Sequence, residues 1–363
     1  MARFAVETAK NLLADEMGID PLEFRLRNSL RPGVGTTATG ADVSQWPFPE
    51  VVEALRPHYQ RALAEAAEHK NGVIRRGVGL GAAGFGIGGP RSQAAAAVEL
   101  DADGGVTLYT GVADPGEGND SMLSQLVAEV LELSLSKVRL VTRNSDLTPA
   151  AGVAAGSRIT YMAGNAAVDA AEQLKQAMVE TGATTAEELA KAGKPVRYTG
   201  IMKSHEEGLD PDTGKGPSEE THVLCLQMAE LEVSTETGEV RVIKVTTAVD
   251  AGLVINPYNF EGQLEGGADQ GVGWALREEY VVGETKDWRT FKFPTMRTSF
   301  PMEHVIRETP RPNGPKGSTG IGEMTMMPTA PAVIAAIHDA VGVWIRDLPA
   351  TPDRIRAAMA AAA

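Results

Sequence analysis

The first seventy residues repeat apolar side chains at the spacing of amphipathic helices. One helix is predicted over residues 2–17, and Asp20 followed by Pro21 is typical of the start of a second helix. A third helix is predicted over residues 50–70, where Pro57 should kink or split it because proline lacks the N–H that helix bonding requires. We therefore expect a helical N-terminal segment.

From residue 72 onward the pattern changes to that of β-strands. The first strand, residues 78–85, is so rich in glycine and alanine that another element is expected close to its backbone, unless the sheet itself simply packs tightly. A hairpin or strand pair is also predicted within residues 278–300. The remaining strands are predicted at residues 94–100, 106–111, 138–142, 223–233 and 239–249.

Helical patterns occur between and after these strands. Thr329 is the predicted N-cap of a helix near the C-terminus. The helices are expected to begin near residue 119, to run from about 160 to 179, to span 185–192, to follow Pro257, and to occupy 330–341 and 351–363. This mixture predicts an α+β fold, with mixed sheets and packed helices. We expect three segments: helical residues 1–70, a strand and helix subdomain at 71–200, and a second one at 201–363.

Composition narrows the class of protein. The chain has 363 residues, of which 43% are hydrophobic and 23% charged, and its net charge of −14 disfavours nucleic acid or an anionic membrane as partner. Its one cysteine, Cys225, excludes an internal disulfide framework and a thiolate cluster, so a reducing compartment, the cytoplasm, is expected. The chain has no apolar run long enough to predict a membrane span. Its six histidines lack paired spacing, so no protein-built metal site is expected.

Two glycine-containing junctions precede predicted helices. Gly116 and Gly118 flank Glu117, and free N–H groups at such a helix start can face an anionic ligand. Gly156, Ser157 and Arg158 repeat the arrangement about forty residues later, with a hydroxyl and a guanidinium fork. Together they suggest a bridging diphosphate ligand. The alternative is that the glycines serve packing alone and that Arg158 pairs with a local acid.

A third group of polar residues lies on the helix after Pro257. Gln263 and Gln270 carry amides that donate and accept together, which suits the edge of a heterocycle, although ordinary capping or interhelix bonds explain them equally well. Gly266, Gly267, Gly271 and Gly273 would each cost about 1 kcal/mol relative to alanine. This helix should therefore pack very close to another element.

Glu323 is the only titratable acid of the stretch 316–331. Gly317, Gly320 and Gly322 precede it and let another molecule approach the backbone closely. A glycine loop, an acid and a helix start in this order suit the edge of an active site. Taken alone, however, the stretch favours the simpler interpretation of Glu323 as a solvated turn or capping residue.

Five of these stretches together resemble one family. In order and spacing they are similar to the molybdenum-cofactor-binding subunit of the xanthine dehydrogenase and aldehyde oxidase family of molybdenum hydroxylases. The matching stretches are Phe4-Ala-Val-Glu7 with Gly18-Ile-Asp-Pro-Leu-Glu-Phe-Arg-Leu-Arg-Asn28, Thr110-Gly-Val-Ala-Asp-Pro-Gly-Glu-Gly118, Gly156-Ser-Arg-Ile-Thr160, Asp250-Ala-Gly-Leu-Val-Ile-Asn-Pro257 with Gly262-Gln-Leu-Glu-Gly266, and Gly320-Ile-Gly-Glu323.

The resemblance implies a function for these residues. Glu323 would be the general base beside the molybdenum of a molybdopterin, expected in its cytosine dinucleotide form. The positions that would hold this cofactor are Gly116, Glu117, Gly118, Gly156, Ser157, Arg158, Gln263 and Gly322. The enzyme would hydroxylate an N-heterocyclic aromatic or oxidise an aldehyde, with water as oxygen source. Electrons would leave through iron–sulfur clusters on a partner subunit, and an FAD subunit is a further candidate partner.

This chain departs from the family pattern at several places. Glu117 stands where the family usually has Gln, and Met324 and Thr325 replace the usual prolines after the catalytic acid. The first half of the family's subunit has no counterpart here, so we expect the C-terminal half of a split subunit that needs a partner chain carrying the other half. A non-catalytic scaffold or assembly subunit is the alternative. An unrelated dinucleotide-binding enzyme is disfavoured, since no Gly-x-Gly-x-x-Gly follows a strand.

Overall fold

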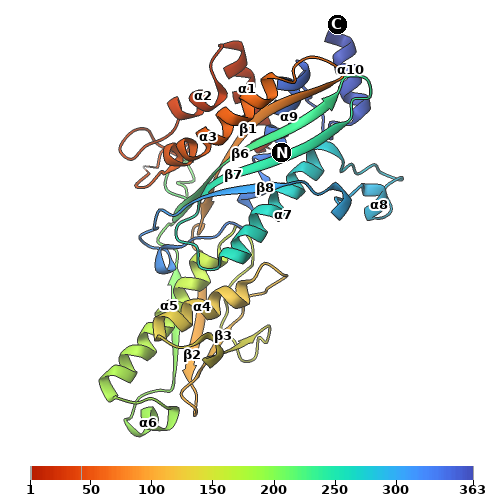
Figure 1. The fold of residues 1–363 in the computed structure, drawn as a ribbon. Helices are drawn as coiled ribbons and strands as arrows, with labels where there is room; N and C mark the ends of the chain where they lie inside the picture. The colour runs from red at the N-terminus through yellow and green to blue at the C-terminus, as the bar shows by residue number, and fades with distance from the viewer. Residues whose placement is uncertain (1, 42, 363) are drawn as a thin grey trace.

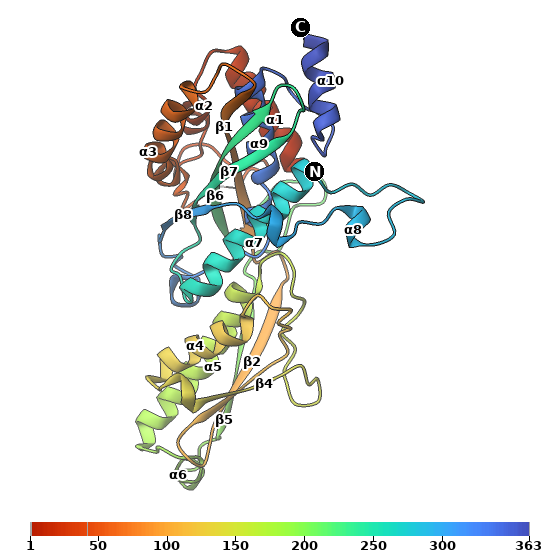
Figure 2. The same cartoon turned by 45° about the vertical axis from the view of Figure 1, so that its right-hand side comes forward.

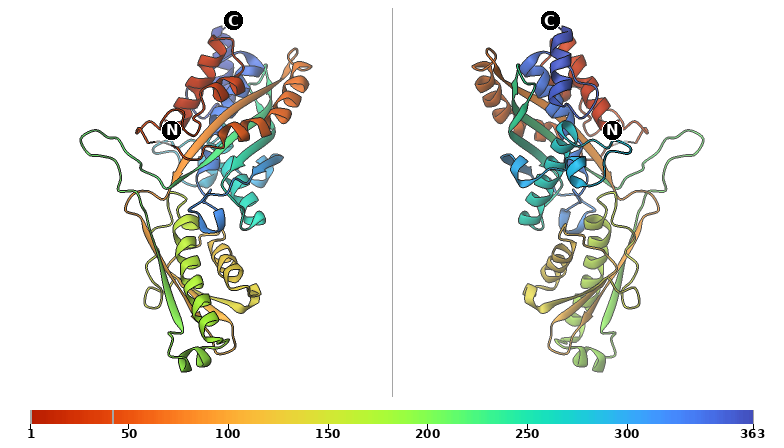
Figure 3. Two further views of the ribbon diagram at one scale, coloured as in Figure 1. Left: turned by 90° about the vertical axis from the view of Figure 1, so that its left-hand side faces the viewer. Right: turned by 90° about the vertical axis from the view of Figure 1, so that its right-hand side faces the viewer.

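The computed structural model describes residues 2–41 and 43–362 and has two lobes arranged end to end (Figure 1). Each lobe contains one four-stranded sheet, with the strand orders β1-β6-β7-β8 and β4-β3-β2-β5. Figure 3 shows the lobes edge-on, with the loop that precedes β6 extending to the side. The predicted α+β fold, with mixed sheets and packed helices, is confirmed.

The first lobe is built on a long, mostly antiparallel sheet. Its strands are β1 (Ile74–Ile87), β6 (Thr221–Ser234), β7 (Val240–Asp250) and β8 (Met302–Arg307), and only β8 runs parallel to its neighbour. The helices of this lobe are α1 (Ala2–Glu16), α2 (Pro21–Arg27), α3 (Phe48–Ala67), α7 (Pro257–Leu276), α9 (Thr329–Val341) and α10 (Pro352–Ala362).

Helix α9 packs against the glycines of β1, as the sequence predicted. A Cβ on Gly79 would lie 2.2 Å from the carbonyl oxygen of Ala332, and Gly77 and Gly81 are equally crowded by α9. The alternate residues of β1, such as Leu80, belong to the core that contains α3. Since successive side chains of a strand point to opposite faces, one glycine-rich strand separates two helices.

The second lobe places two long helices beside its sheet (Figure 2). Its strands are β2 (Gln93–Leu100), β3 (Val106–Thr110), β4 (Val138–Thr142) and β5 (Arg197–Lys203), and its helices are α4 (Asn119–Leu131), α5 (Ile159–Thr181) and the short α6 (Ala186–Lys191). Alanines on β2 and α5 allow a close, fully buried contact. Strand β1 lies in the expected segment 71–200, but it pairs along its whole length with β6, which lies in the expected segment 201–363. The three-segment division itself stays a prediction.

Three local predictions were wrong, the first of them in part. Helix α3 is not split at Pro57, which lies on its exposed side, where water can reach the carbonyl that proline leaves unbonded, and the alternative of a kink stays a prediction. Residues 278–300 form an arm rather than a hairpin, because local caps such as Asp287 with Thr290 close short helical turns, including α8 (Trp288–Phe291). Thr329 is the first residue of α9 rather than its N-cap, and its hydroxyl donates to Gln227 Oε1 at 2.6 Å.

The arm over residues 278–300, which carries α8, projects from the first lobe (Figure 2). It exposes large apolar side chains. Met296 is 95% exposed, Val282 84% and Trp288 74%. Apolar surface gathered on a projecting segment is typical of a contact with another polypeptide. Within the described residues, no helix has the length and apolarity needed to cross a bilayer.

Candidate functional site

A cavity of about 160 Å³ lies where the starts of α4 and α5 meet α7 and the loop before α9. Six of the nine predicted site residues line it, namely Glu117, Ser157, Arg158, Gln263, Gly322 and Glu323. Gly118 lines a smaller adjoining cavity, which shares Glu117 and Gln263. Gly116 and Gly156 do not line either cavity. The fold therefore brings together side chains that are up to about two hundred residues apart in the chain.

Glu323 is held by its backbone while its carboxylate stays exposed. Its N–H donates to Ser157 Oγ at 3.0 Å, and that hydroxyl lies 3.4 Å from Glu323 Oε2. Ser157 adopts φ 51°, an unusual left-handed conformation for a residue with a side chain. A Cβ on Gly320 would lie 1.9 Å from the Ser157 carbonyl oxygen, so only glycine allows the two loops to meet. This contact fixes the position of the Glu323 backbone, from which the carboxylate extends.

The Glu323 loop is anchored to the end of β7 by backbone bonds and a buried ion pair. The Thr319 N–H donates to Ala251 O at 3.1 Å, and Gly252 and Ser318 form a β-bridge. Arg311 Nη1 lies 2.9 Å from Asp250 Oδ1, with both side chains at most 3% exposed. Sequence reasoning missed Arg311, because nothing near it in the chain indicated a buried partner.

The Gly116 to Gly118 turn is closed by the chain's own carboxylate. Asp114 Oδ1 accepts from the N–H groups of Gly116 and Gly118, at 2.9 and 3.1 Å, and its Oδ2 accepts from Asp120 N–H at 3.0 Å. Burial alone would raise the pKa of Asp114, but these N–H donors lower it overall. The expectation that these free amides would bind an external anion is therefore wrong for Gly116 and Gly118.

Arg158 also uses most of its donors inside the protein. Its guanidinium donates to the carbonyl oxygens of Ala151, Val153 and Gln93 and to the hydroxyl of Ser92, at 2.6–3.0 Å. A guanidinium has five N–H groups, so one remains. Its burial lowers the pKa of Arg158. Neither the open anion-binding fork nor the pairing with a local acid is found, and Arg158 instead holds the loop that positions Ser157.

Glu117 and Gln263 also line the cavity. A Cβ on Gly322 would lie 3.8 Å from Gln263 Oε1 and 3.7 Å from Ser157 Oγ, so this glycine separates the two side chains. Asn119, which sequence reasoning missed, donates a side-chain hydrogen bond to Glu117 Oε1 and another to Ala113 O at 3.0 Å. Burial raises the pKa of Glu117, the bond from Asn119 opposes this rise, and the Asp114 carboxylate adds to it.

This raised pKa predicts how Glu117 affects stability as the pH changes. A carboxyl whose folded pKa exceeds its unfolded value binds more protons in the folded state, so stability falls as the pH rises through that window. The substitution Glu117→Gln removes this pH-dependent loss of stability. The variant should therefore gain stability relative to the natural protein as the pH rises above about 4.5. Urea unfolding at pH 4 and pH 7 measures this, with the exposed Glu16→Gln as control, and a pH-independent difference would contradict the assignment.

The glycines of α7 show how closely this helix approaches the loop before α9, the start of α9 and the arm over residues 278–300. A Cβ would meet Thr325 at Gly267, Thr329 at Gly271 and Pro294 at Gly273, all at 2.5 Å or less, whereas Gly266 has open space. The predicted close packing is thus confirmed at three of the four glycines. It brings Gln263, on the same helix, to the cavity.

Comparison with known proteins identifies relatives of the whole chain. The aldehyde oxidoreductase of Megalodesulfovibrio gigas is 36% identical over 371 aligned residues, covering 99% of this chain and 40% of the relative. The putative xanthine dehydrogenase molybdenum-binding subunit of Escherichia coli K12 is 29% identical, covering 97% of this chain and 51% of the relative. The chain thus spans two-fifths to half of the length of these relatives.

The fold and a family profile agree with these relatives. The solved structure of the Desulfovibrio gigas aldehyde oxidoreductase superposes with a TM-score of 0.95 at 33% identity, over 99% of this chain and 40% of that one. Residues 54–299 match the sequence profile described as the molybdopterin cofactor-binding domain. Because the matched region covers more than half of the chain, this protein belongs to the molybdopterin cofactor-binding domain family.

Proposed function

We propose that this chain forms the C-terminal half of the molybdopterin-binding region of a molybdenum hydroxylase, with Glu323 as general base. The observation that carries the proposal is the cavity in which an exposed Glu323 lies beside Ser157, Glu117 and Gln263. Membership of the family supports the cofactor, and the arrangement of a tethered carboxylate at a polar cavity supports the catalytic role.

The residues present fit one part of a molybdopterin. The Gln263 amide and the Ser157 hydroxyl both donate and accept, which suits the edge of a pterin, and Gly322 leaves the cavity open between them. Glu117 and Gly118 would contact a further part of the cofactor in the adjoining cavity. Gly116 and Gly156 would contribute by shaping the backbone turns before α4 and α5. Both cavities are smaller than the roughly 300–1,000 Å³ of complete ligand sites, which supports a site that the remaining half of the molybdopterin-binding region completes.

When bound, the cofactor would supply the metal that takes two electrons from the substrate. The chain's own contribution is the position of one carboxylate. Ser157 holds the backbone of Glu323 while its side chain remains free to accept a proton at Oε1 or Oε2. Arg158 and the ion pair of Asp250 with Arg311 hold the two loops that meet there. This is how an exposed acid in a glycine loop acquires a defined position.

The substrate class that we propose is an aldehyde or an N-heterocyclic aromatic, with water as oxygen source. Relatives with both kinds of name match nearly the full chain, among them an aldehyde oxidoreductase and the nicotine 6-hydroxylase large subunit of Paenarthrobacter nicotinovorans. The cofactor is proposed in its cytosine dinucleotide form. A scaffold without catalysis is the competing function, and variants of Glu323 separate the two.

The proposed partners are the remaining half of the molybdopterin-binding region, an iron–sulfur subunit and an FAD subunit, in the cytoplasm. The exposed arm around Trp288 and Met296 supports a contact with another polypeptide. In the described part of the chain, no group of three or more His, Cys, Asp or Glu side chains is placed to hold a metal ion. Electron-transfer clusters are therefore assigned to the partners.

Analysis of the complex purified from its natural source tests this function. We expect molybdenum together with a pterin, and release of cytidine monophosphate on acid hydrolysis. Absence of both molybdenum and a pterin would remove the proposal. Release of another nucleotide would correct only the dinucleotide form, and a pterin that releases none would also exclude a dinucleotide.

A further inference from the structure

Strand β1 lies at the edge of its sheet, and side chains bond four of its outer hydrogen-bonding groups. The groups concerned belong to every second residue, as expected for one edge of a strand. Asp339 accepts from Val78 N–H, Asn11 donates to Leu80 O, Glu7 accepts from Ala82 N–H and Arg3 donates to Gly84 O, all at 2.8–2.9 Å. An edge covered in this way does not pair with other strands.

The Gly84 carbonyl is the last of these covered groups along β1. In the described residues, neither a side chain nor a loop carbonyl accepts from the N–H groups of Gly84 and Gly86, which by the same alternation point outward. Both glycines are partly exposed. The last part of β1 therefore presents an unpaired edge, the kind of surface to which an extended segment adds as a strand.

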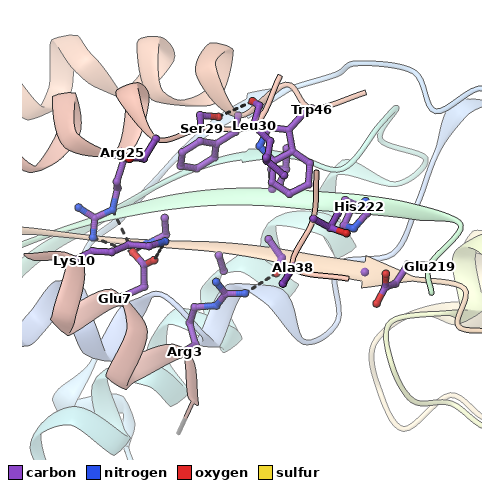
Figure 4. Close-up of a pocket in the computed structure, with 18 of the residues that line it drawn as sticks. Arg3, Glu7, Lys10, Arg25, Ser29, Leu30, Ala38, Trp46, Glu219 and His222 are labelled. Carbon is purple, nitrogen blue, oxygen red and sulfur yellow. Dashed lines mark hydrogen bonds and ion pairs between the residues drawn. The ribbon is translucent and has the colours of Figure 1, made fainter. Parts of the chain in front are cut away.

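A cavity of about 410 Å³ opens at this unpaired edge (Figure 4). Its walls come from α1, α2, the loop around Thr37, and the adjoining ends of β1 and β6. Trp46 and His222 form an edge-to-face pair with ring centroids 5.3 Å apart, and Phe24 adds a further aromatic wall. The cavity thus offers an apolar pocket directly beside free backbone donors.

The cavity carries a small positive charge within an acidic protein. Arg3, Lys10 and Arg25 line it together with Glu7 and Glu219, which leaves one net positive charge, against −14 for the whole chain. Glu7 is fully buried and binds Arg25 at 2.9 Å and Lys10 at 2.7 Å. Burial lowers the pKa of His222, so its ring adds no charge at neutral pH. An acidic side chain is the complementary group for Arg3 in this cavity.

We propose that this cleft binds an extended, acidic segment of the polypeptide that supplies the rest of the molybdopterin-binding region. The segment adds to the edge of β1 at Gly84 and Gly86, seats an apolar side chain against Trp46, and places a carboxylate near Arg3. These two relatives carry about half or more of their length outside the region that matches this chain, which provides such a segment. The inference rests on the proposed function in one respect, because it requires the polypeptide that supplies the rest of the molybdopterin-binding region.

Amide hydrogen exchange in the assembled complex tests the strand addition. Phe85 is the internal reference, because its N–H points toward β6 by the alternation described above. We expect the Gly84 and Gly86 amides to exchange within about tenfold of the Phe85 rate. Faster exchange at both glycines would show an open edge and overturn the proposal.

Photo-crosslinking from position 46 identifies what occupies the cleft. A benzoylphenylalanine in place of Trp46 should crosslink to an acidic segment of the remaining polypeptide, whereas the same group in place of Val179, 75% exposed on the other lobe, should not. A crosslink to a second copy of this chain, or to no polypeptide, as when a small molecule fills the cleft, would refute the assignment.

Charge reversal supplies a measurement that does not depend on a label. Arg3→Glu should weaken assembly by about tenfold, as expected for loss of one complementary charge, whereas the exposed Arg356→Glu should not. Equal affinities for both variants would contradict the acidic segment. Molybdenum content separates this proposal from the function: metal without amide protection contradicts only the cleft, and protection without metal or pterin contradicts only the function.

Discussion

Glu323→Gln should lower turnover by about 10²–10⁴-fold in the purified complex, the usual contribution of a general base. The amide keeps the size of the side chain, and the backbone N–H of residue 323 still donates to Ser157. What the variant loses is the ability to accept a proton. Steady-state turnover with an aldehyde and with an N-heterocyclic aromatic, at matched molybdenum content, measures the effect.

Molybdenum content and a matched variant make this result specific. Glu261→Gln changes another exposed carboxyl, on α7, and should leave turnover unchanged. The base assignment requires that Glu323→Gln retain the metal and the pterin. Near-normal turnover in that variant would instead support the non-catalytic scaffold.

Periodicity and glycine content predicted most of the fold, because these signals reflect burial directly. The glycines of β1 indicated a close neighbour, and α9 is that neighbour. The arm over residues 278–300 was mistaken for a hairpin because its apolar residues resemble a buried strand, yet many of them are exposed. Apolar residues that serve a contact with another chain carry the same pattern as a core, so a single sequence does not separate the two.

The site was predicted only in part, for a different physical reason. The family resemblance singled out Ser157, Gln263 and Glu323, and the fold brings them to one cavity. The partners of Arg158 depend on which carbonyls the tertiary structure places around it, which no local pattern encodes. Asp114 was more accessible to sequence reasoning, since an aspartate two residues before a glycine turn often bonds the following N–H groups.

The buried pair of Asp250 and Arg311 should have the largest effect on stability. Asp250→Ala would leave the Arg311 guanidinium buried without its carboxylate, a change that typically costs about 3–5 kcal/mol. It would also remove the acceptor of Thr309 Oγ, at 2.6 Å, and of Gly252 N–H, at 3.2 Å. Denaturant unfolding of the assembled protein measures the loss.

The same substitution tests how Glu323 is positioned. Gly252 pairs with Ser318 at the base of the Glu323 loop, so a stable preparation of Asp250→Ala should lose turnover while Asp353→Ala, at an exposed ion pair, loses neither stability nor activity. Adding Arg311→Met to Asp250→Ala should restore part of the stability, because it removes the unpaired charge. If the double variant were as unstable as the sum of the single ones, the pair would not act as a unit, and the anchoring of the loop would lie in the backbone bonds alone.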